Sequence, residues 1–66
     1  MTELEKLKHL IEHWIQHNEA HVKTYGEWAA KAEALGKSEL AELLKKIVEE
    51  SKKLNNLFNK ATEIIK

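Results

Sequence analysis

The sequence of 66 residues contains no cysteine and no proline, and it has only two glycines. Without cysteine the chain can form no disulfides, zinc–thiolate sites or iron–sulfur clusters, and no thiol catalysis. No apolar run approaches the roughly 20 residues that span a bilayer, and Glu3 and Glu5 stand where a signal peptide would carry basic residues. We therefore expect a cytoplasmic protein without a membrane partner.

Arginine and aspartate are also absent, so eleven lysines balance eleven glutamates and the net charge is zero with neutral histidines. A nucleic-acid-binding protein normally has a basic surplus, and bidentate recognition of phosphate needs arginine. No Ser-His-Asp arrangement, glycine-rich phosphate loop or reactive cysteine is visible. The sequence therefore predicts neither a nucleic-acid partner nor an enzyme.

What the sequence does contain is a helical pattern in two segments. Thr2 and Glu5 form a capping-box pattern before the first, in which apolar residues recur at alternating steps of three and four. Gly36 follows this segment, where a left-handed residue commonly ends a helix, and Ser38 is the expected N-cap of the second. The pattern predicts one all-α domain over 1–66, an antiparallel two-helix hairpin with a helix over about 3–34, a turn at 36–38 and a helix over about 39–65.

Each predicted helix has an apolar stripe that we expect to face the other helix. The stripe of the first helix is Leu4, Leu7, Ile11, Trp14, Asn18, His21, Tyr25, Trp28, Ala32 and Leu35. The stripe of the second helix is Leu40, Leu44, Ile47, Ser51, Leu54, Phe58, Ala61 and Ile65. Further apolar residues flank both stripes, and such wide arcs are typical of four-helix bundles.

Association is therefore part of the prediction, since small domains without disulfides often complete their core in this way. We expect a homodimer of hairpins that forms a four-helix bundle. The alternatives are a monomeric hairpin with an exposed apolar patch and a hairpin docked on another protein. Gly26 lies inside the first helix at a cost of about 1 kcal/mol relative to alanine, so a break there, giving a three-helix bundle, is a further alternative.

All four histidines of the chain stand four residues apart, at His9, His13, His17 and His21. Residues at this spacing are neighbours on a helix, and imidazole is the commonest metal-ligating side chain. Each histidine is turned by about 40° from the one before it. The ladder is thus predicted to enter the core at His21, while His9 lies on the solvated side.

Polar residues are expected to meet in one layer midway along the predicted seam. In an antiparallel register His21 should lie opposite Ser51, beside Asn18 and close to Asn55. Buried polar groups without partners cost about 1–3 kcal/mol each, so this layer must be hydrogen-bonded, hydrated or occupied by a ligand. A polar layer without a ligand is also common, because polar seam residues fix register and oligomeric state.

The function that the ladder favours is binding of a transition metal ion: zinc, nickel, cobalt or copper. His17 and His21 are the expected primary ligands, His13 is the next and His9 the last. The supporting polar groups would be Asn18, Ser51 and Asn55. In a dimer, His17 and His21 of both chains would supply four nitrogen ligands.

Two other functions remain open at this point. One is a self-association or protein-interaction module in which the histidines form a pH-sensitive layer. The other is a haem-binding bundle with His21 or His17 as the axial ligand. The run from His9 to His13 also matches the HxxEH zincin pattern, but that pattern is short and the chain offers no cleft for a substrate.

The run His13-Trp14-Ile15-Gln16-His17-Asn18-Glu19-Ala20-His21 and the residues after it resemble a family of small helical domains encoded in archaea and bacteria. The residues that follow and carry the resemblance are Tyr25, Trp28, Ala29, Lys31, Ala32 and Gly36. Members of this family have an HWxxHNxxH-type segment and no assigned activity. Some carry additional histidine-rich tails, so the resemblance implies metal handling and groups His13, His17 and His21.

Overall fold

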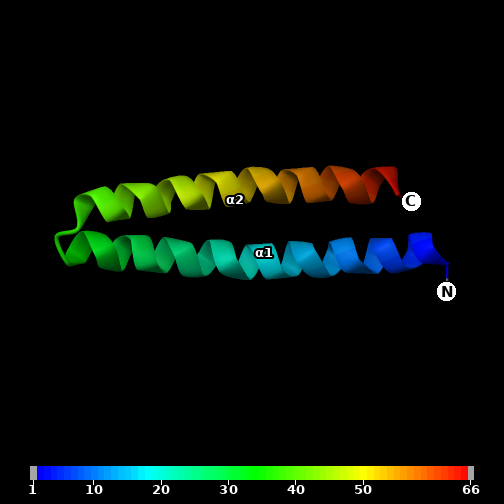
Figure 1. Cartoon of the computed structure of the whole chain (residues 1–66), viewed down its shortest axis with the longest axis horizontal. Helices are drawn as coiled ribbons and strands as arrows, with labels where there is room; N and C mark the ends of the chain where they lie inside the picture. Colours follow the sequence, from blue (N-terminus) through cyan, green and yellow to red (C-terminus); the bar gives the residue numbers. More distant parts are fainter. Residues whose placement is uncertain (1, 66) are drawn as a thin grey trace.

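The computed structural model describes residues 2–65, which form two helices joined by a short turn (Figure 1). Helix α1 spans Glu3–Ala34 and helix α2 spans Ser38–Ile64. The helices run antiparallel side by side, so both chain ends lie at the same end of the rod. The predicted all-α hairpin is confirmed. Within the described residues, neither helix has a stretch long and apolar enough to cross a membrane.

Helix α1 begins as the sequence predicts. Thr2 is its N-cap, and the Glu5 amide donates a hydrogen bond of 3.1 Å to the Thr2 hydroxyl oxygen. The helix then continues through Gly26 without a break, so the three-helix alternative is wrong. A Cβ atom at Gly26 would meet nothing within 4 Å, so no close helix approach requires glycine there.

The turn ends α1 with a Schellman motif. The Lys37 amide donates to the Ala32 carbonyl at 2.9 Å, and the Gly36 amide donates to the Glu33 carbonyl at 3.0 Å. Gly36 has a φ of 78°, a conformation that side chains with a Cβ rarely adopt. The predicted cap of α2 is wrong, because Lys37 is the capping residue and Ser38 already belongs to the helix, with no side-chain capping bond.

An ion pair joins the two helices near this turn. Lys45 Nζ lies 3.2 Å from Glu33 Oε2 on α1 and 3.5 Å from Glu42 Oε1 on its own helix. The hydrogen bond from Lys45 to Glu33 and the charges of both carboxylates raise the pKa of Lys45. All three side chains are exposed, so the solvent screens this pair.

The two helices meet along a heptad seam, and its residues are buried or half-buried over most of its length. On α1 the seam consists of Ile11, Ile15, Asn18, Val22, Tyr25, Ala29 and Ala32. On α2 and its C-cap residue Ile65, it consists of Ala41, Leu44, Val48, Ser51, Asn55, Phe58, Thr62 and Ile65. Both sets alternate steps of three and four, as antiparallel helix packing requires.

This seam is rotated about each helix axis from the predicted stripe. On α1 the predicted members Trp14, His21 and Trp28 are exposed, and Ile15, Val22 and Ala29 lie inward in their place. The rotation has a physical reason. Two helices alone can bury only one seam, and the apolar arc of each helix is wider than that.

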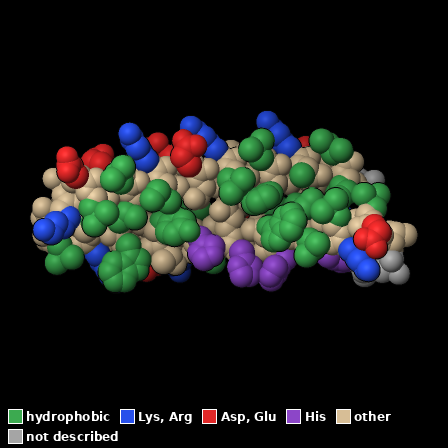
Figure 2. Space-filling model, viewed as in Figure 1, with side chains coloured by type: hydrophobic (Ala, Val, Ile, Leu, Met, Phe, Trp, Pro, Cys, Tyr) green, Lys and Arg blue, Asp and Glu red, His purple; other side chains and the backbone are tan. Residues whose placement is uncertain are grey.

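Most of the large apolar residues left outside the seam form what we call the open face. On α1 it contains Leu7, Leu10, Trp14, Trp28 and Leu35. On α2 it contains Leu40, Leu43, Ile47, Leu54, Leu57 and Ile64. Figure 2 shows hydrophobic side chains gathered over both helices on this face, with the histidines along the α1 edge and lysines and glutamates along the outer edge of α2.

Nothing within the described residues covers the open face. The described residues form two helices side by side, and their extents along the principal axes are 51 × 16 × 11 Å. The hairpin is therefore one layer thick. Helical domains normally bury their apolar faces between two layers.

Candidate metal centre

The histidine ladder lies on α1 with neighbouring rings in contact. The ring centroids of His13 and His17 are 4.4 Å apart, and those of His17 and His21 are 6.1 Å apart. All three side chains are exposed, so a metal ion in solution can reach their rings. His17 is shared by both pairs, which makes it the central ligand candidate of the ladder.

His21 lies outside the helix seam, contrary to the prediction that the ladder enters the core there. Its side chain is exposed, and its ring stacks on the half-buried Tyr25 ring at a centroid distance of 5.8 Å and an angle of 14°. The rotation of the seam explains the difference, since Val22 takes the inward position. Stacking on Tyr25 nevertheless restrains the His21 ring.

His9 is separate from the other three histidines. Its Nδ1 atom lies 3.9 Å from Glu12 Oε2, and both side chains are about half exposed or more. The helical rotation of about 40° per step carries it furthest from the open face. His9 is therefore the natural control residue for any experiment on the ladder.

Within residues 2–65, no three or more histidine, aspartate or glutamate side chains are placed together to hold a metal ion. A single hairpin thus offers pairs of imidazoles rather than a complete set of ligands. Zinc sites in proteins are almost always four-coordinate. The other positions would have to be filled by water or by ligands from another molecule.

Asn18, Ser51 and Asn55, which were predicted to surround His21, lie together in the seam, but His21 is not among them. Asn18 is only 9% exposed, and its Nδ2 atom donates a hydrogen bond of 2.7 Å to the Ser51 backbone carbonyl. The same atom lies 3.5 Å from Asn55 Oδ1. This polar layer is satisfied by its own hydrogen bonds, since no buried side-chain nitrogen or oxygen among the described residues lacks a partner.

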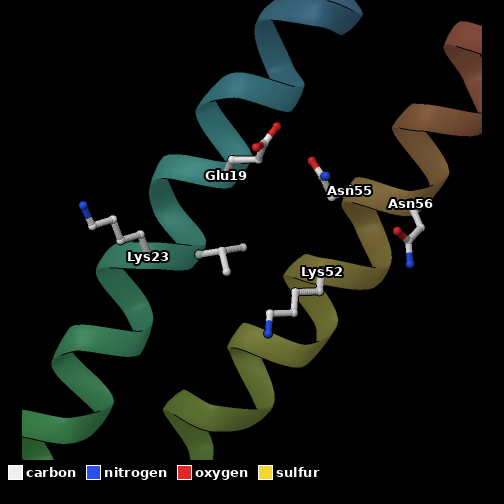
Figure 3. Close-up of a pocket in the computed structure, with 6 residues that line it drawn as sticks. Glu19, Lys23, Lys52, Asn55 and Asn56 are labelled. Carbon is white, nitrogen blue, oxygen red and sulfur yellow. The ribbon is translucent and has the colours of Figure 1, made fainter.

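The face opposite the open face carries a groove of about 520 Å³ between the helices. It is lined by Glu19, Val22, Lys23, Lys52, Asn55 and Asn56. In Figure 3 Glu19 and Asn55 point toward one another from the two helices, while Lys23 points away. No histidine lines this groove, so it is separate from the ladder.

A second groove lies on the open face of α2, and it contains a residue that the sequence analysis missed. Glu50 lines it together with Leu43, Ile47 and Leu54. Its Oε1 atom lies 3.3 Å from Lys53 Nζ, and its side chain is 72% exposed. The signal in the sequence was its position between Ile47 and Leu54, where it interrupts an apolar heptad pattern.

A single-layer helical hairpin with a histidine ladder beside an open apolar face defines the class of this protein. The chain belongs to the family described as "Domain of unknown function (DUF8180)", whose model matches residues 7–65. It is 32% identical over 62 residues to an "Uncharacterized protein" of Archaeoglobus fulgidus, and this match covers 94% of the chain and 98% of the relative. No solved structure matches the chain. Membership of a small family without an assigned function, with an archaeal relative, is thereby confirmed.

Proposed function

We propose that this protein binds a divalent transition metal ion, such as zinc, nickel, cobalt or copper, through the histidine ladder of α1. The contact of consecutive rings from His13 to His21 is the observation that carries the proposal. Neutral imidazole nitrogens at i,i+4 spacing suit these metals, and the absence of thiolates disfavours Cu(I). His17 and His21 are the primary ligands, His13 is the next, and His9 contributes least.

Self-association is a second candidate function, and the open face favours it. Trp28, Leu43 and Leu57 are each more than half exposed in the isolated hairpin. Contiguous apolar surface of this kind marks an interaction site. A homodimer that buries the open face would be the four-helix bundle that the wide apolar arcs predict.

The two candidates are compatible, because His17 and His21 border the open face. The grooves described above are lined by no histidine, so nothing favours the haem alternative over a metal ion. The metal proposal can be tested without knowing the oligomeric state.

Calorimetric titration of the metal-free protein with Zn²⁺, Ni²⁺, Co²⁺ and Cu²⁺ is that test. The parent chain should bind at least one of them more tightly than about 100 μM. The double variant His17→Ala/His21→Ala should weaken this binding strongly, and His9→Ala should leave it nearly unchanged. Binding weaker than that limit for all four ions, or equal binding by the double variant, would contradict the proposal.

A further inference from the structure

The open face is apolar along most of its length, and its polar interruptions fall together near the middle. On α1, steps of three and four residues lead from Trp14 toward Trp28, and His17 and His21 lie on these steps. On α2, Glu50 lies three residues after Ile47 and four residues before Leu54, on the same face. A polar residue inside an apolar stripe is costly to bury unless it has a partner.

His21 and Glu50 lie at the same level along the hairpin. Asn18 contacts both Ser51 and Asn55, so its level on α2 lies between these two residues. Because the helices are antiparallel, three residues forward on α1 correspond to three residues backward on α2. Three residues forward from Asn18 on α1 is His21. Three residues backward from the level midway between Ser51 and Asn55 on α2 is Glu50.

The occupant that the open face fits is a second copy of this chain. The solvent-accessible surface is 5297 Å², whereas a compact monomer of 7.7 kDa exposes about 4,300 Å². The excess of about 1,000 Å² is close to the area that one partner contributes to a stable protein–protein interface. A second layer over this face would also supply the missing half of a four-helix bundle.

The face is also self-complementary on α1. Trp14 and Trp28 each lie seven residues from His21, and Leu7 and Leu35 each lie fourteen residues from it. A two-fold axis across the helices at this level would place Trp14 of one chain against Trp28 of its partner. Isologous interfaces require such reciprocal contacts.

The same symmetry holds on α2 around Glu50. Leu43 and Leu57 lie seven residues to either side, and Ile47 and Leu54 lie three and four residues away. A two-fold axis parallel to the helices keeps every residue at its own level and pairs α1 with α2 of the partner. With either two-fold axis, His21 and Glu50 of both chains therefore lie in one layer of the interface.

From this geometry we infer that two copies of the chain pack through their open faces and share a metal site at the middle of the interface. The site keeps His21 of the proposed ladder as a ligand, Glu50 of each chain takes the place of His17 as its partner, and His17 lies one helical turn away. This inference rests on the proposed metal-binding function and deepens it, because the site is incomplete without the second copy. Two imidazole nitrogens and two carboxylate oxygens are a ligand set that suits Zn²⁺.

Charge supports a cation in this layer. Two Glu50 carboxylates brought together at a desolvated interface would repel each other, and a divalent ion balances their charge. In the single hairpin the charge of Glu50 is offset by Lys53 at 3.3 Å. Lys53 is 70% exposed, so it can turn away when the carboxylate binds the ion.

The test is zinc stoichiometry measured together with mass, by calorimetry and sedimentation equilibrium on the whole chain. The parent should bind one Zn²⁺ per two chains, and zinc should shift the monomer–dimer equilibrium toward the dimer. Glu50→Gln and His21→Ala should each lower zinc affinity by roughly tenfold or more and should weaken the effect of zinc on dimerisation. The matched controls Glu49→Gln and His9→Ala should behave as the parent does.

All four of these side chains are exposed in the hairpin, so each variant should keep its helix content, which far-UV circular dichroism checks. Binding of one zinc per monomer, sensitive to His17→Ala and insensitive to Glu50→Gln, would keep the proposed function and overturn the shared site. A dimer whose association constant does not respond to zinc would overturn it as well. No zinc binding by the parent would refute both proposals.

Discussion

Replacement of Asn18 tests how the two helices are held in register. Asn18 is the buried polar residue of the seam, and its amide bonds to the Ser51 carbonyl at 2.7 Å. Asn18→Ala removes this bond, which is worth about 0.5–1.5 kcal/mol. It also removes buried side-chain atoms. Alanine regains part of the loss through its better helix propensity, by up to about 0.7 kcal/mol. We expect a net loss of about 1 kcal/mol.

Asn18→Leu should instead raise the free energy of unfolding. The Ser51 carbonyl lies within α2 and keeps its helical partner, and the half-buried Asn55 can bond to water. Leucine replaces the buried amide by apolar atoms, and burial of leucine contributes about 1.5–3 kcal/mol. After subtraction of the lost hydrogen bond we expect a gain of about 1 kcal/mol. Register should then be less well defined, because a polar seam residue no longer specifies it.

The assay is urea denaturation of the parent and both variants at one fixed chain concentration, because association changes apparent stability. The free energies of unfolding should rank Asn18→Leu first, the parent second and Asn18→Ala last. If Asn18→Leu were less stable than Asn18→Ala, the bond to Ser51 would contribute far more than a neutral hydrogen bond, and the reasoning would be refuted.

Three further predictions concern the glycines and the open face. Gly26→Ala should stabilise the protein by about 1 kcal/mol and raise Tm by roughly 4–8 °C in a thermal scan, because α1 is continuous there and the added Cβ meets nothing; a lower Tm would mean that Gly26 contacts a partner or breaks the helix. Gly36→Ala should destabilise by about 1–2 kcal/mol in urea denaturation, since its φ is 78°; unchanged stability would show that the Schellman turn is not kept in solution. Ile47→Glu should shift sedimentation toward the monomer with little change in stability of the hairpin, because Ile47 is 44% exposed on the open face; an unchanged mass distribution would count against that face as the interface.

The bounds of both helices could be predicted from the sequence because local chemistry sets them. Thr2 caps α1 through its own hydroxyl, and Gly36 supplies the positive φ that ends it. Ser38 was predicted as a cap on the same logic, but α2 begins at Ser38 itself, directly after the turn in which Lys37 bonds to Ala32. A one-residue shift of this kind depends on the geometry of the turn, which composition does not determine.

The rotation of the seam could not be read from the sequence. A helical wheel gives the centre of an apolar arc, and that centre lies between the buried seam and the open face. His21 lies on the open side of that centre and Asn18 on the buried side, so the wheel grouped them in one layer. The stripe predicted from the wheel therefore lies between the seam and the open face, and the hairpin buries only one side of it.

Ring resonances of the histidines offer the most direct test of the claim that the ladder holds a metal ion. Protein with ¹⁵N-labelled histidine rings can be titrated with Zn²⁺ and followed by NMR, with assignments from single His→Ala variants. The account predicts that the ring nitrogens of His17 and His21 shift first, while those of His9 stay unchanged. Ring shifts that are absent, or that are equal for His9 and His17, would contradict it.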